Sequence, residues 1–201
     1  MILKVCGMRD PGNIRELVRI KPDWMGLIFY SGSARWVHSP APASPSIKRV
    51  GVFVDSSKSE IVRMAETNDL DLIQLHGKET PGFCLDIIKE GFKVVKAFAL
   101  HEEFDFTSLK EYHFCDYFLF DTLGAFPGGN GVPFNWEWLS SYRGNVPFLL
   151  SGGIGPESIP RLKGFSHPRW IGIDVNSRFE ITPGFKDIEK IKEFKDAIFS
   201  G

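Results

Sequence analysis

Eight short apolar runs, spread along nearly the whole chain of 201 residues, constrain its fold more than any other feature. They are rich in valine, isoleucine, leucine and phenylalanine and are nearly continuous, as in strands that are buried on both faces of a parallel sheet. The runs cover residues 2–6, 25–29, 49–54, 71–75, 93–98, 116–120, 147–151 and 169–174. With about 25 residues for each unit, little chain is left for a second domain.

Helical patterns lie between several of these runs. Apolar spacing or capping residues predict helices over 58–67, 80–90, 155–163 and about 184–199. The proline-rich connection 31–48 argues against a full helix there. Alternation of strand and helix predicts a single (β/α)₈ TIM-barrel domain over residues 1–201. An open doubly wound sheet has the same alternation, but no GxGxxG sequence follows the first run and eight strands suit closure.

Composition excludes several classes of function. A net charge of −1 gives no indication of a nucleic acid or an anionic membrane as partner, and no apolar run approaches the ~20 residues of a membrane span. Three widely spaced cysteines make neither a disulfide framework nor a zinc motif. The first residues lack the pattern of a secretion leader. We therefore expect reduced thiols, a cytoplasmic location and a small-molecule partner, with monomer and homodimer both open.

Polar residues end two of the predicted strands. Cys6 closes the first run and Asp121 follows the sixth. In a barrel of parallel strands these ends lie on one face, where residues distant in sequence share one pocket. A thiol and a carboxylate placed there are suited to work as a base and an acid. Alternatively, Cys6 is a buried core residue and Asp121 only a polar end to its strand.

A glycine-rich segment, residues 151–158, follows the seventh run and opens a helical segment. Glycines let backbone N–H groups approach an anion, and a helix N-terminus adds partial positive charge. Barrels often bind phosphate between the loops after strands seven and eight, and residues 174–178 supply the second loop. A simple tight turn is the alternative. The presence of both loops favours a phosphate site.

Two further side chains and one loop are candidates. Arg35 follows the second run and is able to hold a carboxylate in a bidentate fork, or is a surface charge. His76 follows the fourth run, either as a substrate contact or in a structural hydrogen bond. The glycine-rich loop 124–132 is either a lid over the site or a plain connection.

The chain resembles a known family across nearly its whole length and in the same order of motifs. The matching segments are Lys4–Met8, Gly26–Tyr30, Ser33–Val37, Val50–Val54, Gln74–Glu79, Phe120–Asp121, Gly128–Trp136, Ser151–Ile154 and Asp174–Ser177. Together they are similar to phosphoribosylanthranilate isomerase of tryptophan biosynthesis. The resemblance implies a (β/α)₈ barrel and an aldose–ketose isomerase that performs an Amadori rearrangement, with neither cofactor nor metal.

The resemblance also implies a role for each matching residue. Asp121 would be the general acid and Cys6 the general base, while Arg35 would hold the substrate carboxylate and His76 and Asp174 would contact substrate. The phosphate would be bound by Gly152, Gly153, Asn176 and Ser177. Such chemistry requires a thiolate available near the working pH, although a free thiol has a pKa of about 8.5. The acid, conversely, must keep its proton near neutrality.

One departure from the family and two other functions stay open. Arg178 stands where the family usually has glycine, and we hypothesise that it adds charge to the phosphate site. The indole-forming lyase of the next pathway step would need a catalytic lysine, for which Lys96 is the candidate. A non-catalytic protein that binds a phosphorylated metabolite would need neither Cys6 nor Asp121.

Overall fold

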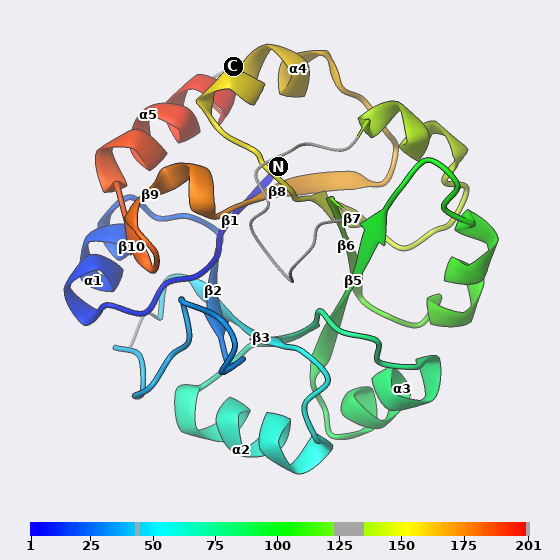
Figure 1. Ribbon diagram of the computed structural model, residues 1–201, viewed down its shortest axis with the longest axis horizontal. Coiled ribbons are helices and arrows are strands. Elements are labelled where there is room, and N and C mark those ends of the chain that lie inside the picture. Colours follow the sequence, from blue (N-terminus) through cyan, green and yellow to red (C-terminus); the bar gives the residue numbers. More distant parts are fainter. Residues whose placement is uncertain (43–44, 123–134, 200–201) are drawn as a thin grey trace.

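A closed barrel of eight parallel strands forms the centre of the molecule (Figure 1). The computed structural model describes residues 1–42, 45–122 and 135–199. In chain order the strands are β1 (Ile2–Val5), β2 (Trp24–Ile28), β3 (Lys48–Phe53), β4 (Leu72–Leu75), β5 (Lys93–Leu100), β6 (Tyr117–Thr122), β7 (Phe148–Leu150) and β8 (Trp170–Val175). Each strand pairs with the next, and β8 closes on β1. The barrel prediction is confirmed, and the open sheet is excluded.

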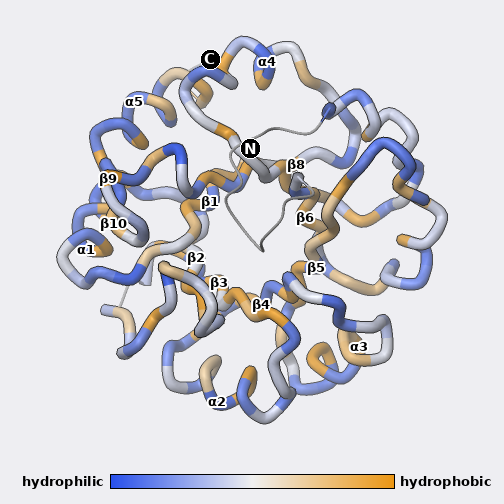
Figure 2. Tube along the Cα trace, viewed as in Figure 1, coloured by the Kyte–Doolittle hydropathy of each residue, from blue (hydrophilic) through white to orange (hydrophobic). Residues whose placement is uncertain are grey.

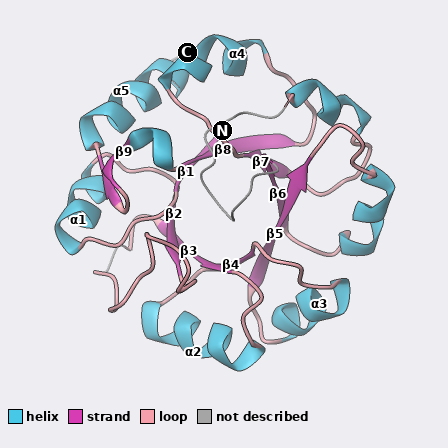
Figure 3. Cartoon of the chain, in the orientation of Figure 1, coloured by secondary structure: helices cyan, strands magenta, loops and turns pink. Residues whose placement is uncertain are grey.

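Helices surround the barrel (Figure 3). The α-helices are α1 (Pro11–Arg19), α2 (Lys58–Asn68), α3 (Pro81–Lys89), α4 (Ile159–Gly164) and α5 (Ile188–Phe199), and the 3₁₀ helices are η1 (Phe106–Tyr112), η2 (Trp136–Ser141), η3 (Pro156–Ser158) and η4 (Ser177–Phe179). The side chains of Ser57 and Thr80 cap α2 and α3 by accepting backbone N–H bonds, as their positions predict. Within the described ranges no helix has the length and apolarity needed to cross a membrane.

The structure departs from the predicted helices at both ends of the chain. Helix α1 was not among them, although Asp10 caps it and Pro11 occupies its first turn. The last helix begins at Ile188 rather than near 184, because residues 184–186 belong to a hairpin of β9 (Glu180–Thr182) and β10 (Phe185–Lys186). The described parts of 31–48 contain no helix, as expected. The predicted lid, 124–132, lies outside the described residues.

Alternation of side chains along the strands divides the core in two. One cluster, made of Trp24, Val50, Leu72, Val95, Ala97, Leu119 and Leu149, fills the barrel interior. A larger cluster packs between the strands and the surrounding helices, and the apolar strands stand out at the centre of Figure 2. Residues two positions beyond interior leucines, such as Gln74, Asp121 and Ser151, point to the same side. The polar site is therefore a continuation of the interior cluster.

A buried ion pair fastens the loops after β3 and β4. The Lys96 Nζ atom on β5 lies 2.9 Å from Glu79 Oε2 and also donates to the carbonyls of Leu75 and Gly77. Glu79 in turn accepts bonds from the backbone N–H groups of Asp55 and Gly77. Both charged side chains are only 3% exposed. The pair therefore fixes the segment that carries His76.

We expect Lys96→Met to lower the free energy of unfolding by about 3–5 kcal/mol, because it leaves the Glu79 carboxylate buried without its cation. Urea denaturation of the purified variant measures the change. Lys89→Met is the control, because the Lys89–Asp86 pair is exposed and such pairs contribute little. Equal midpoints for Lys96→Met and the wild-type protein would contradict a stabilising role for the pair.

Candidate active site

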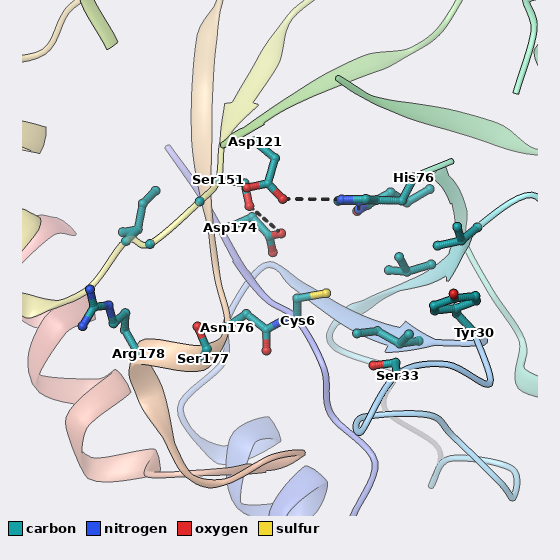
Figure 4. Close-up of a pocket in the computed structure, with 17 residues that line it drawn as sticks. Cys6, Tyr30, Ser33, His76, Asp121, Ser151, Asp174, Asn176, Ser177 and Arg178 are labelled. Atoms are coloured by element: carbon teal, nitrogen blue, oxygen red, sulfur yellow. Dashed lines mark hydrogen bonds and ion pairs between the residues drawn. The ribbon is translucent and has the colours of Figure 1, made fainter. Parts of the chain in front are cut away.

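One pocket at the carboxyl ends of the strands gathers most of the predicted site residues (Figure 4). Eight of the nine line it, namely Cys6, His76, Asp121, Gly152, Gly153, Asp174, Asn176 and Ser177. They come from β6, β8 and the segments that follow β1, β4, β7 and β8. The exception is Arg35. Position at strand ends in the sequence therefore identified residues that the fold brings into one pocket.

Asp121, near the end of β6, is held from two sides. Its Oδ1 atom accepts a 2.7 Å bond from the backbone N–H of Thr122, and its Oδ2 atom lies 3.4 Å from His76 Nε2. The amide Nε2 of Gln74 is 2.7 Å from His76 Nδ1. If that amide nitrogen donates, the imidazole carries its proton on Nε2 and directs it at Asp121. His76 thus orients the carboxylate, and Gln74 orients His76.

Cys6 follows β1 and is only 4% exposed, although it lines the pocket. Its backbone N–H donates to the carbonyl of Val175 on β8, which completes the β1–β8 ladder. Gly26 on β2 lies so close that an added Cβ atom would be 2.7 Å from Cys6 Sγ. Burial raises the pKa of the Cys6 thiol, and the Lys4 ammonium opposes that rise. Burial therefore favours the neutral thiol of Cys6 over its thiolate.

Lys4 and Asp174, of which only Asp174 lines the pocket, form a buried ion pair that was not predicted. Lys4 Nζ on β1 is 3.0 Å from Asp174 Oδ1 on β8, and neither side chain is more than 5% exposed. Asp174 Oδ2 in turn lies 3.4 Å from the Ser151 hydroxyl. Sequence reasoning treated Lys4 only as part of an apolar run. Its position two residues before Cys6, on the same face of the strand, was the available signal.

The glycine loop after β7 approaches the acid closely. Gly152 and Gly153 have φ values of +85° and +65°, which favour glycine. A Cβ atom on Gly152 would lie 2.7 Å from Asp121 Oδ1, so no larger residue fits there without displacing the carboxylate. The predicted helical segment 155–163 is present over 156–164, but its first turn is the 3₁₀ helix η3 and only the six residues of α4 are α-helical. Backbone N–H groups of the loop, more than a long helix, are therefore available to an anion.

Arg35 holds a carboxylate in a bidentate fork, but the carboxylate belongs to the protein. Its Nε and Nη2 atoms lie 2.8 and 2.7 Å from the two Glu180 oxygens. Lys186 Nζ also bonds Glu180, at 2.7 Å, and Asn176 Oδ1, at 2.6 Å. Burial opposes ionisation of Glu180, but bonds from Arg35 and Lys186 outweigh it and lower the pKa of Glu180 to about 2. The β9–β10 hairpin thus ties Arg35 to Asn176 in the loop after β8.

The remaining candidate groups lie outside the pocket lining. Cys84 and Cys115 are free and buried. Lys96 is engaged by Glu79 and by two backbone carbonyls. Among the residues that the structure describes, no cluster of three or more His, Cys, Asp or Glu side chains has an arrangement suited to a metal ion.

A closed (β/α)₈ barrel with a polar pocket at the carboxyl ends of its strands defines the class of TIM-barrel enzymes. The family model for N-(5'-phosphoribosyl)anthranilate (PRA) isomerase matches residues 3–197. The chain belongs to this family and is an isomerase of tryptophan biosynthesis.

Individual relatives agree over nearly the full length of the chain. The N-(5'-phosphoribosyl)anthranilate isomerase of Phocaeicola vulgatus is 47% identical over 196 residues, which cover 96% of each chain. That of Parabacteroides distasonis is 46% identical over 202 residues, covering 96% of this chain and 91% of the other. A solved phosphoribosyl anthranilate isomerase in complex with reduced 1-(o-carboxyphenylamino)-1-deoxyribulose 5-phosphate is 28% identical, with a TM-score of 0.82 and full coverage of both chains.

Proposed function

We propose that this isomerase converts N-(5-phosphoribosyl)anthranilate to 1-(2-carboxyphenylamino)-1-deoxyribulose 5-phosphate, with Asp121 as general acid and Cys6 as general base. The observation that carries the assignment is their position in one pocket, together with the glycine loop after β7. Asp174 also lines this pocket, but its carboxylate is paired with the Lys4 ammonium at 3.0 Å, whereas Asp121 has no lysine or arginine partner of this kind among the described ion pairs. The two groups supply the two proton transfers that the rearrangement needs.

The first step opens the sugar ring. Asp121, in its protonated form, gives a proton to the ribose ring oxygen, the C1–O bond breaks, and the anilino nitrogen forms a double bond to C1. The product is an iminium ion, a protonated Schiff base. The His76 Nε2 atom, 3.4 Å from Asp121 Oδ2, supports the carboxylate left behind when the proton has moved.

The second step moves the proton from C2. The iminium ion draws electrons from C2, so the Cys6 thiolate removes the C2 proton and an enolamine forms. Tautomerisation of the enolamine then gives the ketone. The net reaction is an isomerisation in which no atom is gained or lost. Because burial raises the pKa of Cys6, thiolate formation is the demanding part of this step.

The ends of the substrate are assigned to opposite parts of the site. We assign the phosphate to the backbone of Gly152 and Gly153 and to Asn176 and Ser177, all of which line the pocket. We assign the anthranilate carboxylate to Arg35, whose side chain passes over Gly7 beside Asn176. Since Nε and Nη2 bind Glu180, the carboxylate would meet the remaining edge of the guanidinium. His76 and Asp174 are assigned as contacts to the ribose.

Arg178 borders the phosphate part of the pocket. It lines the pocket next to Ser177, and its Nε atom lies 3.7 Å from Glu157 Oε1. We expect Arg178→Ala to raise KM for the phosphorylated substrate several-fold and to leave kcat nearly unchanged, because a phosphate far from the reacting carbons is bound similarly before and during the reaction. Steady-state kinetics with Lys192→Ala, an exposed lysine on α5, as control measure the effect. An unchanged KM would remove Arg178 from the phosphate site.

The two other functions fit the geometry less well. An indole-forming lyase would need Lys96 in the pocket, but its ammonium is bound to Glu79 and to the carbonyls of Leu75 and Gly77. A protein that only binds a phosphorylated metabolite has no use for an acid and a base placed in one pocket. These observations support the isomerase with the assigned residues.

The test follows the fluorescence of phosphoribosylanthranilate, which is generated in situ, after purified protein is added. Accelerated loss of fluorescence with the wild-type protein, and its absence with Cys6→Ser, would support both the reaction and the base. If the wild-type protein leaves the decay unchanged, the proposed reaction is wrong and another phosphorylated ligand is required.

The extent of the domain, residues 1–201, and the assembly of the chain, monomer or homodimer, stay predictions. Sedimentation equilibrium of the purified protein distinguishes the two states of assembly. A cytoplasmic location is also retained as a prediction, in keeping with three free, buried cysteines. We further propose that the reaction proceeds with neither metal nor cofactor, which activity after exhaustive dialysis against a chelator would test.

A further inference from the structure

The reaction as assigned leaves one buried cation without a role. The Lys4 side chain is fully buried, and it is among the largest side chains in the core. A lysine in such a place is rare unless a partner holds it. Its partner is Asp174, 3.0 Å away, so the pair has a structural explanation. Because Lys4 lies two residues before Cys6 on the same face of the strand, the pair is also placed to affect the ionisation of the Cys6 thiol.

The barrel register brings the three groups together. Lys4 and Cys6 are two residues apart, so both point into the barrel. On the neighbouring strand Lys4 is aligned with Asp174, and Val5 with Val175. The Lys4 ammonium therefore lies between the Asp174 carboxylate beside it and the Cys6 thiol above it, and it interacts with both. Burial opposes its charge, but Asp174 and Cys6 outweigh burial and raise the pKa of Lys4, so the ammonium stays charged.

Other charges near Cys6 come from every neighbouring element. Asp174 on β8, Lys186 on β10 and Arg35 after β2 interact electrostatically with Cys6, while Asp121 on β6 and His76 after β4 line the same pocket. Two of the cations, Arg35 and Lys186, converge on Glu180. Asp174 is the anion that disfavours a thiolate at Cys6, and Lys4 is the cation that opposes burial most strongly.

We propose that Lys4 is a positioning residue whose ammonium group stabilises the thiolate form of Cys6. Asp174 holds this ammonium in place and, as an anion, partly cancels its electrostatic effect on the sulfur. The inference rests on the proposed role of Cys6 as general base. If Cys6 is the base, the acidic limb of the pH–rate profile depends on three residues together, namely Cys6 and the Lys4–Asp174 ion pair.

The test measures the ionisation of Cys6 without using the reaction. The rate of Cys6 alkylation by iodoacetamide is followed from pH 6 to 10, with the Cys6 peptide quantified by mass spectrometry, because the thiolate is the reactive form. We expect Lys4→Met to shift the midpoint to higher pH and to slow alkylation at pH 8 about ten-fold. Lys58→Met, which changes an exposed lysine, is expected to leave the midpoint unchanged.

A second variant gives the opposite sign. Asp174→Asn keeps the ammonium and removes the anion, so the midpoint is expected to fall below that of the wild-type protein. Circular dichroism confirms that each variant is folded; if Lys4→Met is not, the Asp174→Asn measurement alone decides. A midpoint in Lys4→Met equal to that of the wild-type protein, or a midpoint in Asp174→Asn that is unchanged or higher, would overturn the proposal.

The same variants separate this inference from the proposed function. If the isomerase assay succeeds, the acidic limb of kcat/KM should move with the alkylation midpoint in both variants. If the wild-type protein lacks isomerase activity but the midpoints shift as expected, the proposed function fails while the effect of Lys4 on Cys6 stands. If the wild-type protein has isomerase activity but the alkylation midpoints of the variants do not shift, the proposed function stands and the effect of Lys4 on Cys6 is wrong.

Discussion

Asp121→Asn is expected to lower kcat for phosphoribosylanthranilate by about 10²–10⁴-fold, the range usual for loss of a general acid. An amide has nearly the same shape as a carboxylic acid but has no acidic proton to give to the ring oxygen. Because the change is isosteric, the pocket should still bind substrate, and KM should change only a few-fold. Steady-state kinetics across pH 5–9 measure both quantities.

Asp116→Asn is the matched control for this variant. Asp116 precedes the opposite end of β6, where its Oδ2 atom accepts a 2.9 Å bond from the backbone N–H of Val94. The same chemical change there should affect stability and leave kcat within a few-fold of the wild-type value. If Asp121→Asn kept near-normal kcat, the acid would have to be assigned to another group.

Cys6→Ser is expected to lower kcat by a similar factor, about 10²–10⁴-fold, because a serine hydroxyl is far less acidic than a thiol and does not form the anion that takes the C2 proton. Substrate deuterated at C2 provides the diagnostic measurement. With proton removal slowed, the variant should show a larger isotope effect on kcat than the wild-type enzyme. Ring opening by Asp121 should continue.

Cys84→Ser controls for the loss of a buried thiol. Cys84 is as inaccessible as Cys6 but lies on α3, outside the pocket lining. We expect it to reduce stability and to preserve kcat and the isotope effect. A Cys6→Ser enzyme with normal turnover would rule out the thiolate mechanism and would assign the C2 proton to another base.

Much of this fold could be predicted because its signals are local. Apolar runs mark the eight strands. In a barrel of parallel strands all the carboxyl ends lie on one face, so the residues at these ends are expected to gather there. Cys6, Asp121 and His76 were therefore placed correctly from their positions alone. Helix α1 carried an equally local signal in Asp10 and Pro11, which the sequence reasoning did not use.

The parts that could not be predicted depend on contacts between distant segments. Glu180 holds Arg35 across 145 positions of sequence, and it belongs to a hairpin that includes residues 184–186, where the last helix was predicted to begin. Lys4 meets Asp174 only after the barrel closes. The sequence separation of such residues does not predict that they pair, because their contact depends on the tertiary fold and not on the periodicity of a helix or strand.

The Lys4–Asp174 pair also bears on how the chain is made. The two residues are 170 positions apart, so a ribosome delivers the cation long before its anion. Until β8 emerges, β1 carries a lysine whose place inside the barrel would leave a buried charge without a partner. Lys4 therefore gains its buried partner only when β8, the last strand of the barrel, has joined β1, so the pocket that contains Cys6 is completed late in the assembly of the barrel.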